Sequence, residues 1–279
     1  MPLRPVALVV FSAFLHAAWN ATIKREKDPR SAGVAVLAAA TLMAFAATPF
    51  SAAPAFPRAV GLRWALLAGV LEGGYFATLG LALARGPLGP AYTVARGGAM
   101  LVAWPISALF LGEPFPLSAK AGVGLIGCGL GITAIRTREH TTSASLAWAM
   151  ACAVCIGGYH LCYKLALAAD VEPRALFAVA LACALPINLA CVGRHGAINA
   201  WHALRESPFR LLVGGATCTA SFLVFLGALA SVGAGAVLAL RNTSVFFAQV
   251  LAVWGGERPT IRAITGAALV LVGAYVLSR

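Results

Sequence analysis

Long apolar runs separated by short polar connections are the feature that most restricts the fold of this 279-residue chain. The hydrocarbon core of a bilayer is about 30 Å thick, so a helix that crosses it needs about 20 mostly apolar residues. Runs of this kind lie at 5–23, 31–50, 62–84, 90–111, 118–136, 145–168, 173–193, 209–231, 235–255 and 260–278. The sequence therefore predicts an all-α integral membrane protein with ten transmembrane helices in a lipid bilayer.

The composition agrees with a membrane protein. Only 11% of the residues are charged and 61% are hydrophobic, whereas a soluble domain carries about 25% charged residues. The net charge of +12 suits Lys and Arg side chains in short loops that meet lipid headgroups. No Lys/Arg run is long enough to follow a phosphate backbone, so we expect no nucleic-acid partner. The absence of a GxxxxGKS/T motif argues against ATP chemistry in this chain.

The two halves of the chain match each other at an offset of about 144 residues. The matching pairs are His16 with His160, Trp19 with Tyr163, Asp28-Pro29-Arg30 with Glu172-Pro173-Arg174, Arg96 with Arg241, and Gly112-Glu113 with Gly256-Glu257. They divide the chain into a first repeat, 1–142, and a second repeat, 143–279. Each repeat holds five predicted helices, and because five is odd, the second repeat enters the membrane from the opposite side. We therefore predict two inverted five-helix repeats, an architecture typical of transporters with a substrate site near the bilayer midplane.

This pattern resembles one family over essentially the whole chain. A His-Ala-x-Trp-Asn segment lies at 16–20, and a Gly-Glu pair closes the fourth and the ninth predicted helices. These motifs in two five-helix halves resemble the drug/metabolite transporter superfamily, most closely its EamA-type exporters. The resemblance implies a multi-pass protein of the plasma or inner membrane that transports small metabolites, often by exporting amino acids or related compounds. Some members use a proton gradient, so the proton is the candidate coupling ion.

The orientation of the chain in the membrane stays open, as does its oligomeric state. The family is usually drawn with both termini in the cytoplasm, which places the loops at 24–30, 136–142, 193–210 and 256–262 outside. These loops hold most of the loop Lys and Arg residues, whereas the positive-inside rule prefers basic loops in the cytoplasm.

Glu72 is an acidic residue near the middle of the third predicted helix. An ionisable residue at membrane depth is costly, so it usually faces a cavity or a partner. Its neutral form is favoured there, which suits it to carry a proton. It is therefore the candidate proton-coupling residue or a contact for a substrate ammonium group. The alternative is an internal salt bridge, for example with Arg96 or Lys164.

Arg96 and Arg241 form a symmetric pair inside the fourth and ninth predicted helices. A guanidinium can hold a carboxylate or phosphate with two hydrogen bonds. It can also extend to the headgroups or brace an unwound helix end. We favour bracing because both halves keep Arg, while the next residue changes from Gly97 to Asn242.

A polar stripe on the first helix completes the predicted site. His16, Asn20 and Lys24 are spaced four apart and share one helix face; Lys24 marks the membrane boundary. The full set of predicted substrate-binding residues is His16, Trp19, Asn20, Tyr75, Tyr92, Arg96, Tyr159, His160, Tyr163, Arg241, Asn242 and Gln249. The alternative for each histidine is a buried ring that only bonds a neighbouring helix. Two histidines without a third ligand do not make a transition-metal site, so we expect neither a metal nor another cofactor.

Two features concern helix shape and packing. Pro105 lies inside the fourth predicted helix, where a proline frees a carbonyl and forms either a gating kink or a tolerated bend. Glycines four apart, Gly69/Gly73 and Gly127/Gly131, are typical of closely packed membrane helices.

The sequence as a whole favours a secondary transporter with alternating access to a midplane cavity, with a small-molecule substrate. A membrane-embedded sensor or scaffold is one alternative. An intramembrane enzyme is another, but no GxSxG or HExxH motif occurs, and we expect no enzyme activity.

Overall fold

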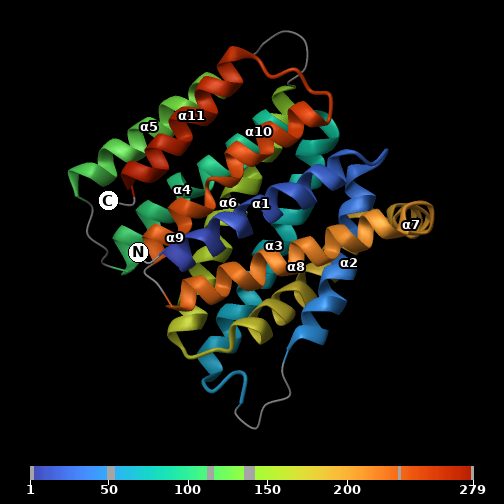
Figure 1. Ribbon diagram of the computed structural model, residues 1–279. Helices are drawn as coiled ribbons and strands as arrows, with labels where there is room; N and C mark the ends of the chain where they lie inside the picture. The colour runs from blue at the N-terminus through green and yellow to red at the C-terminus, as the bar shows by residue number, and fades with distance from the viewer. Residues whose placement is uncertain (1–2, 49–53, 112–115, 135–141, 232–233, 278–279) are drawn as a thin grey trace.

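The computed structural model describes residues 3–48, 54–111, 116–134, 142–231 and 234–277, and this part of the chain contains helices and no strand. Figure 1 shows these helices packed into one bundle. In chain order they are α1 (Leu3–Lys24), α2 (Pro29–Ala47), α3 (Ala59–Arg85), α4 (Leu88–Leu111), α5 (Leu117–Ala134), α6 (Ser143–Ala168), α7 (Pro173–Glu206), α8 (Pro208–Ser231), α9 (Ala234–Arg241), α10 (Ser244–Trp254) and α11 (Ile261–Leu277). The predicted all-α class is confirmed for the described residues.

Six helices are long and apolar enough to cross a membrane, judged by length and composition over the described residues. They are α1, α2, α3, α6, α7 and α8. Large apolar side chains cover the outside of the bundle: Leu42, Phe209 and Ile261 are 74%, 82% and 82% exposed. Extended apolar surface of this kind needs a lipid or protein partner, and with several long apolar helices it belongs to a multi-span membrane protein.

The predicted ninth helix, 235–255, is two helices in the structure. α9 ends at Arg241, and α10 follows after a turn formed by Asn242 and Thr243. The carbonyl of Leu240 accepts hydrogen bonds from both the amide of Thr243, over 3.0 Å, and its hydroxyl, over 2.7 Å. Polar side chains that bond nearby carbonyls compete with helical hydrogen bonds. The Asn-Thr pair inside an otherwise apolar run therefore explains the break.

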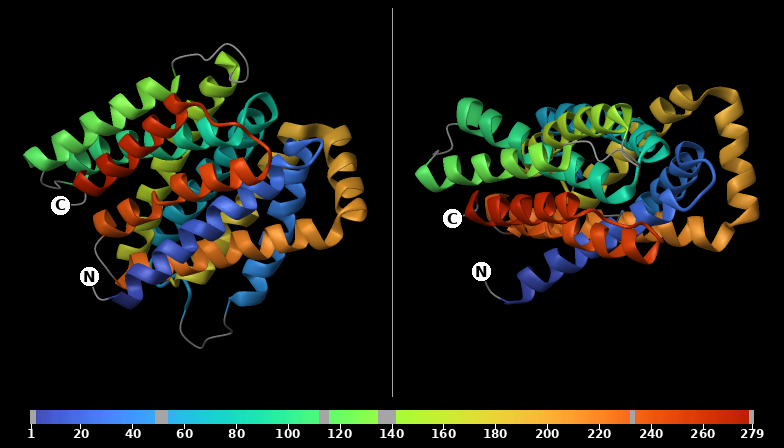
Figure 2. Two further views of the ribbon diagram at one scale, coloured as in Figure 1. Left: turned by 45° about the horizontal axis from the view of Figure 1, so that its top comes forward. Right: turned by 90° about the horizontal axis from the view of Figure 1, so that it is seen from above.

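The connection predicted at 193–210 is largely helical, because α7 continues to Glu206. Gly193 alone leaves the helical conformation, with φ 67° and ψ −174°. Glycine adopts positive φ values without the steric cost that other residues meet. α7 therefore turns sharply at this residue, as Figure 2 shows.

Helices from the two halves of the chain pack against each other throughout the bundle. α1 lies along α8, α3 along α6, α2 against α7, and α5 against α11. Glycines bring some backbones close together. A Cβ atom on Gly69 of α3 would lie 2.6 Å from the Cβ of Cys183 on α7, and one on Gly215 of α8 would lie 2.6 Å from the Cβ of Ala39 on α2.

Of the two predicted glycine pairs, one packs closely and the other does not. Gly69 and Gly73 both face α7, so that prediction is confirmed. Among the described residues, an added Cβ on Gly127 or Gly131 would meet no atom of another helix within 4 Å, so that prediction is wrong. The close contact of α5 is made by Gly129, which faces α11. Spacing identifies a face of small residues but not which face a neighbouring helix covers.

The repeated Asp-Pro-Arg and Glu-Pro-Arg segments form the same local structure. Asp28 accepts hydrogen bonds from the amides of Arg30 and Ser31 at the start of α2. Glu172 accepts a 2.7 Å hydrogen bond from the amide of Ala175 at the start of α7. A proline follows each capping residue at the beginning of the helix, where its missing N–H has no cost.

α4 is held at its start by the second Gly-Glu pair. Glu257 accepts hydrogen bonds from the amides of Leu88 and Gly89, over 2.7 and 3.3 Å. The matching pair, Gly112-Glu113, lies outside the described residues. α4 continues across Pro105, whose side chain is exposed.

Candidate functional site

His16 lies in a buried cluster formed by α1, α3, α8 and α9. Its Nδ1 atom lies 3.1 Å from Nη2 of Arg241 and 3.4 Å from the indole nitrogen of Trp19. Its Nε2 atom lies 3.4 Å from the hydroxyl of Tyr75. Guanidinium and indole groups only donate hydrogen bonds, so Nδ1 must accept and the ring proton sits on Nε2. His16 is therefore a neutral histidine that connects several helices.

Arg241, the last residue of α9, is the main link in this cluster. Its Nη1 donates to the hydroxyl of Ser12 over 2.5 Å and to the carbonyl of Ser221 over 3.2 Å. The guanidinium carbon also lies 4.9 Å from the ring centre of Phe222 and 4.1 Å from that of Phe225, at cation–π distance. Arg241 thus holds the broken end of α9 against α1 and α8.

The predicted aromatic residues meet around this cluster. The ring centres of Tyr75 and Trp19 are 6.3 Å apart, those of Tyr75 and Tyr159 are 5.7 Å apart, and those of Tyr159 and Tyr163 are 5.4 Å apart. Tyr92 lies 6.3 Å from His16 by the same measure. These distances lie within the range of favourable ring contacts. Trp19 and the four tyrosines therefore pack, together with His16, as one aromatic wall.

Glu72 is completely buried beside this wall. The hydroxyl of Tyr163 donates a 2.5 Å hydrogen bond to its Oε2 atom. The other carboxyl oxygen, Oε1, has no hydrogen-bond partner in the described part of the chain. Among the described residues, Glu72 forms no ion pair with Arg96. Glu72 is thus a buried carboxyl with one oxygen bonded to Tyr163 and the other without a partner among the described residues.

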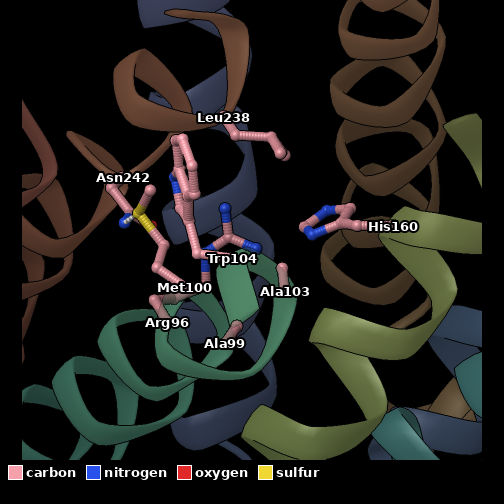
Figure 3. Close-up of a pocket in the computed structure, with 8 residues that line it drawn as sticks. All are labelled: Arg96, Ala99, Met100, Ala103, Trp104, His160, Leu238 and Asn242. Atoms are coloured by element: carbon pink, nitrogen blue, oxygen red, sulfur yellow. Dashed lines mark hydrogen bonds between the residues drawn. The ribbon is translucent and has the colours of Figure 1, made fainter. Parts of the chain in front are cut away.

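A pocket opens between α4, α6 and α9. It is lined by Arg96, Ala99, Met100, Ala103, Trp104, His160, Leu238 and Asn242. Figure 3 shows Arg96 and His160 reaching into it from α4 and α6, with Trp104 beside Arg96. Arg96 is only 2% exposed, yet its Nε and Nη1 atoms have no hydrogen-bond partner among the described residues. The Nε2 atom of His160 is unpartnered in the same way.

Five lining residues are absent from the predicted substrate-binding set: Ala99, Met100, Ala103, Trp104 and Leu238. The signal for two of them is helical periodicity, because Arg96, Met100 and Trp104 are spaced four apart and share one face of α4. Leu238 has no such signal, because only the fold brings α9 against α4.

The remaining predicted residues lie away from this pocket. The amide of Asn20 donates to the carbonyl of His16 on its own helix over 2.6 Å. Gln249 donates to the hydroxyl of Thr93 over 3.1 Å and contacts the first turn of α4 near Gly89. The predicted set is thus divided between the pocket, the buried cluster behind it and one interhelical contact.

Comparisons with known proteins agree with this architecture. A solved structure described only as the crystal structure of a protein has a similar fold, with a TM-score of 0.53 and 20% sequence identity. The match covers 97% of this chain and 95% of that one. No curated protein matches the sequence. Residues 143–279 match the model of the EamA-like transporter family, and the chain is therefore an EamA-type member of the drug/metabolite transporter superfamily.

Proposed function

We propose that this chain is a secondary transporter that exports small metabolites across the plasma or inner membrane. It has ten spans, the ninth broken into α9 and α10, in two inverted repeats at 1–142 and 143–279. Rocking of the two repeats opens the pocket between α4, α6 and α9 to each side of the membrane in turn.

The packing of the helices supports the inverted repeat. Exchanging each helix for its counterpart in the other repeat turns the α1–α8 pair into the α6–α3 pair, and both pairs are present. The α2–α7 and α5–α11 pairs map onto themselves. The contact of Gly69 with Cys183 likewise corresponds to that of Gly215 with Ala39. The family match also begins at residue 143, where the second repeat begins.

One observation carries the transport proposal: Arg96 places unpaired donors in a pocket inside the bundle. A buried donor without a partner is costly, and more so within a membrane. A substrate group that accepts these hydrogen bonds would remove that cost. Asn242, at the break between α9 and α10, lines the same pocket, so movement of the broken helix would change access to the substrate.

Glu72 is the proposed proton-coupling residue. Its burial, its hydrogen bond from Tyr163 and its unpartnered Oε1 atom support a role in which the carboxyl gains and loses a proton during the cycle. Pro105 is a candidate gating residue of α4, and its exposed position suits a bend on the outer side of that helix.

The proposal is tested with purified protein in liposomes loaded with a radiolabelled metabolite extract. Efflux above that of protein-free liposomes, lost in Arg96→Gln and kept in Arg174→Gln, is the expected result. The side chain of Arg174 is 54% exposed, and Arg174 is not among the residues that line the pocket. Binding of metabolites without flux would instead indicate a sensor or scaffold, and chemical conversion of the load would indicate an enzyme.

A further inference from the structure

The two repeated arginines have different surroundings. Arg241 is held by Ser12, Ser221 and His16, and its guanidinium stacks on phenylalanine rings. Among the described residues, Nε and Nη1 of Arg96 have no hydrogen-bond partner, and Arg96 lines a pocket. Both Nη atoms of Arg241 thus have partners and only its Nε lacks one, whereas Arg96 keeps two nitrogens available.

The sequence explains why Arg96 lacks the contacts of Arg241. On α6, Ile156 stands at the position equivalent to Ser12 of α1, since both lie four residues before the repeated histidine. On α3, Tyr75 stands where α8 carries Ser221, because Gly69 and Gly215 make the equivalent contacts and each precedes this position by the same spacing. An isoleucine accepts no hydrogen bond. The first repeat therefore cannot form the serine bridge that holds Arg241.

The pocket beside Arg96 has an unbalanced charge. None of its lining residues is acidic, while Arg96 and His160 both present nitrogen atoms to it. The guanidinium offers donors in a planar fork that matches a carboxylate. A cation or a substrate ammonium group finds no carboxylate on the walls of this pocket.

The rest of the lining is apolar. Trp104, Met100 and Leu238 provide aromatic and aliphatic surface, and Ala99 and Ala103 add small apolar side chains. Indole rings and thioethers favour flat or flexible apolar groups. The surface next to the guanidinium therefore suits an apolar body attached to the anionic group.

We propose that the pocket binds a carboxylate with an apolar or aromatic body and without a neighbouring ammonium group, held by Arg96 and His160. The inference rests on the proposed function, because it names the class of substrate that the transporter takes. Arg96 binds the carboxylate oxygens with its free N–H groups, and the Nε2 atom of His160 donates a further hydrogen bond in the tautomer that carries the proton there.

Isothermal calorimetry on the purified full chain tests this with four probes of similar shape: phenylacetate, phenylacetamide, phenethylamine and phenylalanine. Hydrogen bonds to a charged group predict that phenylacetate binds at least about tenfold more tightly than the amide or the amine. Phenylalanine is expected to bind more weakly than phenylacetate, since its ammonium group has no partner. Equal binding of the amide or amine, tighter binding of phenylalanine, or no binding of phenylacetate at millimolar concentration would each overturn the proposal.

Variants then assign the preference to the pocket. Arg96→Gln is expected to remove the preference for phenylacetate over phenylacetamide, and Arg96→Lys to keep part of it, because a lysine is cationic but lacks the planar fork. Arg174→Gln is the matched surface control and keeps the full preference. A preference that survives in a folded Arg96→Gln protein contradicts the assignment. If that variant does not fold, the comparison of probes on the unaltered protein still decides.

Calorimetry needs neither a membrane nor transport, so the two proposals fail separately. A preference for phenylacetate without flux in liposomes leaves the binding site standing and contradicts the transporter. Flux of neutral or cationic metabolites without any preference for carboxylates in calorimetry supports the transporter and contradicts the carboxylate site.

Discussion

Gly69→Ala is expected to destabilise the bundle by separating α3 from α7. The new methyl carbon would lie 2.6 Å from the Cβ of Cys183 and 2.7 Å from the carbonyl oxygen of Ala180. Since apolar atoms prefer about 3.5–4.0 Å, the helices would have to move apart by about 1 Å. Overpacking of this kind costs about 1–3 kcal/mol. Replacing glycine by alanine within a helix contributes about 0.5–1 kcal/mol in the other direction. We therefore expect a net loss of up to about 2.5 kcal/mol, and about 1 kcal/mol at the middle of these ranges, in the free energy of unfolding.

Gly127→Ala is the matched control, because in the described part of the chain its added methyl group meets no atom of another helix within 4 Å. It is expected to keep or raise the stability. Thermal unfolding in detergent, followed by tryptophan fluorescence, compares the two variants with the unaltered chain. A loss of 1 kcal/mol corresponds to a fall of roughly 2–4 °C in Tm for a chain of this size class. If Gly69→Ala is as stable as Gly127→Ala, the close packing of α3 on α7 is refuted.

Three further changes test other parts of the structure. Burial alone would raise the pKa of Asp28, but the hydrogen bonds from Ser31 and Arg30 outweigh it and lower the pKa. Because the folded-state pKa is lowered, the carboxylate stabilises the fold above its ordinary pKa, and this contribution is lost as the pH falls through the lowered value. Asp28→Ala should therefore cost about 1 kcal/mol of unfolding free energy at pH 7 and little at strongly acidic pH; an equal loss at both pH values would oppose this. Glu257→Ala should lower the stability by about 1 kcal/mol through loss of the α4 cap, measured by thermal unfolding, and an unchanged Tm would count against the cap. Glu72→Gln should abolish the pH dependence of flux in liposomes, and flux that still follows the pH gradient would rule out the coupling role.

The helices and their order were predictable, while two local departures were not. Apolar runs of the length of a bilayer crossing indicate helices directly, because lipid leaves few other options. The break at Asn242 and Thr243 depends on side-chain hydrogen bonds that hydropathy does not register. α7 changes direction at Gly193, where a single residue adopts a positive φ angle, and then continues as a helix. The charged residues after Gly193 are as typical of a loop as of a helix, so the sequence did not indicate this continuation.

The residue types of the site were also predictable, but their division of roles was not. The repeat predicts that Arg96 and Arg241 are equivalent, and their shared presence in both halves favours bracing for both. Only the neighbouring helices distinguish them: Ser12 and Ser221 accept hydrogen bonds from Nη1 of Arg241, while Nε and Nη1 of Arg96 have no partner in the part of the chain that the structure describes. Trp104 lines the pocket because it lies on the same face of α4 as Arg96. The sequence spacing shows this shared face, but its importance is clear only when the position of the pocket is known.

The most direct test of the central claim, that this transporter binds its substrate at Arg96, is counterflow of radiolabelled phenylacetate in liposomes. Wild-type protein and Arg174→Gln should both exchange the label, after subtraction of the protein-free leak. Arg96→Gln should reduce the exchange by about tenfold, the factor expected for lost hydrogen bonds to a charged group. Equal exchange by folded Arg96→Gln and wild-type protein would contradict the claim.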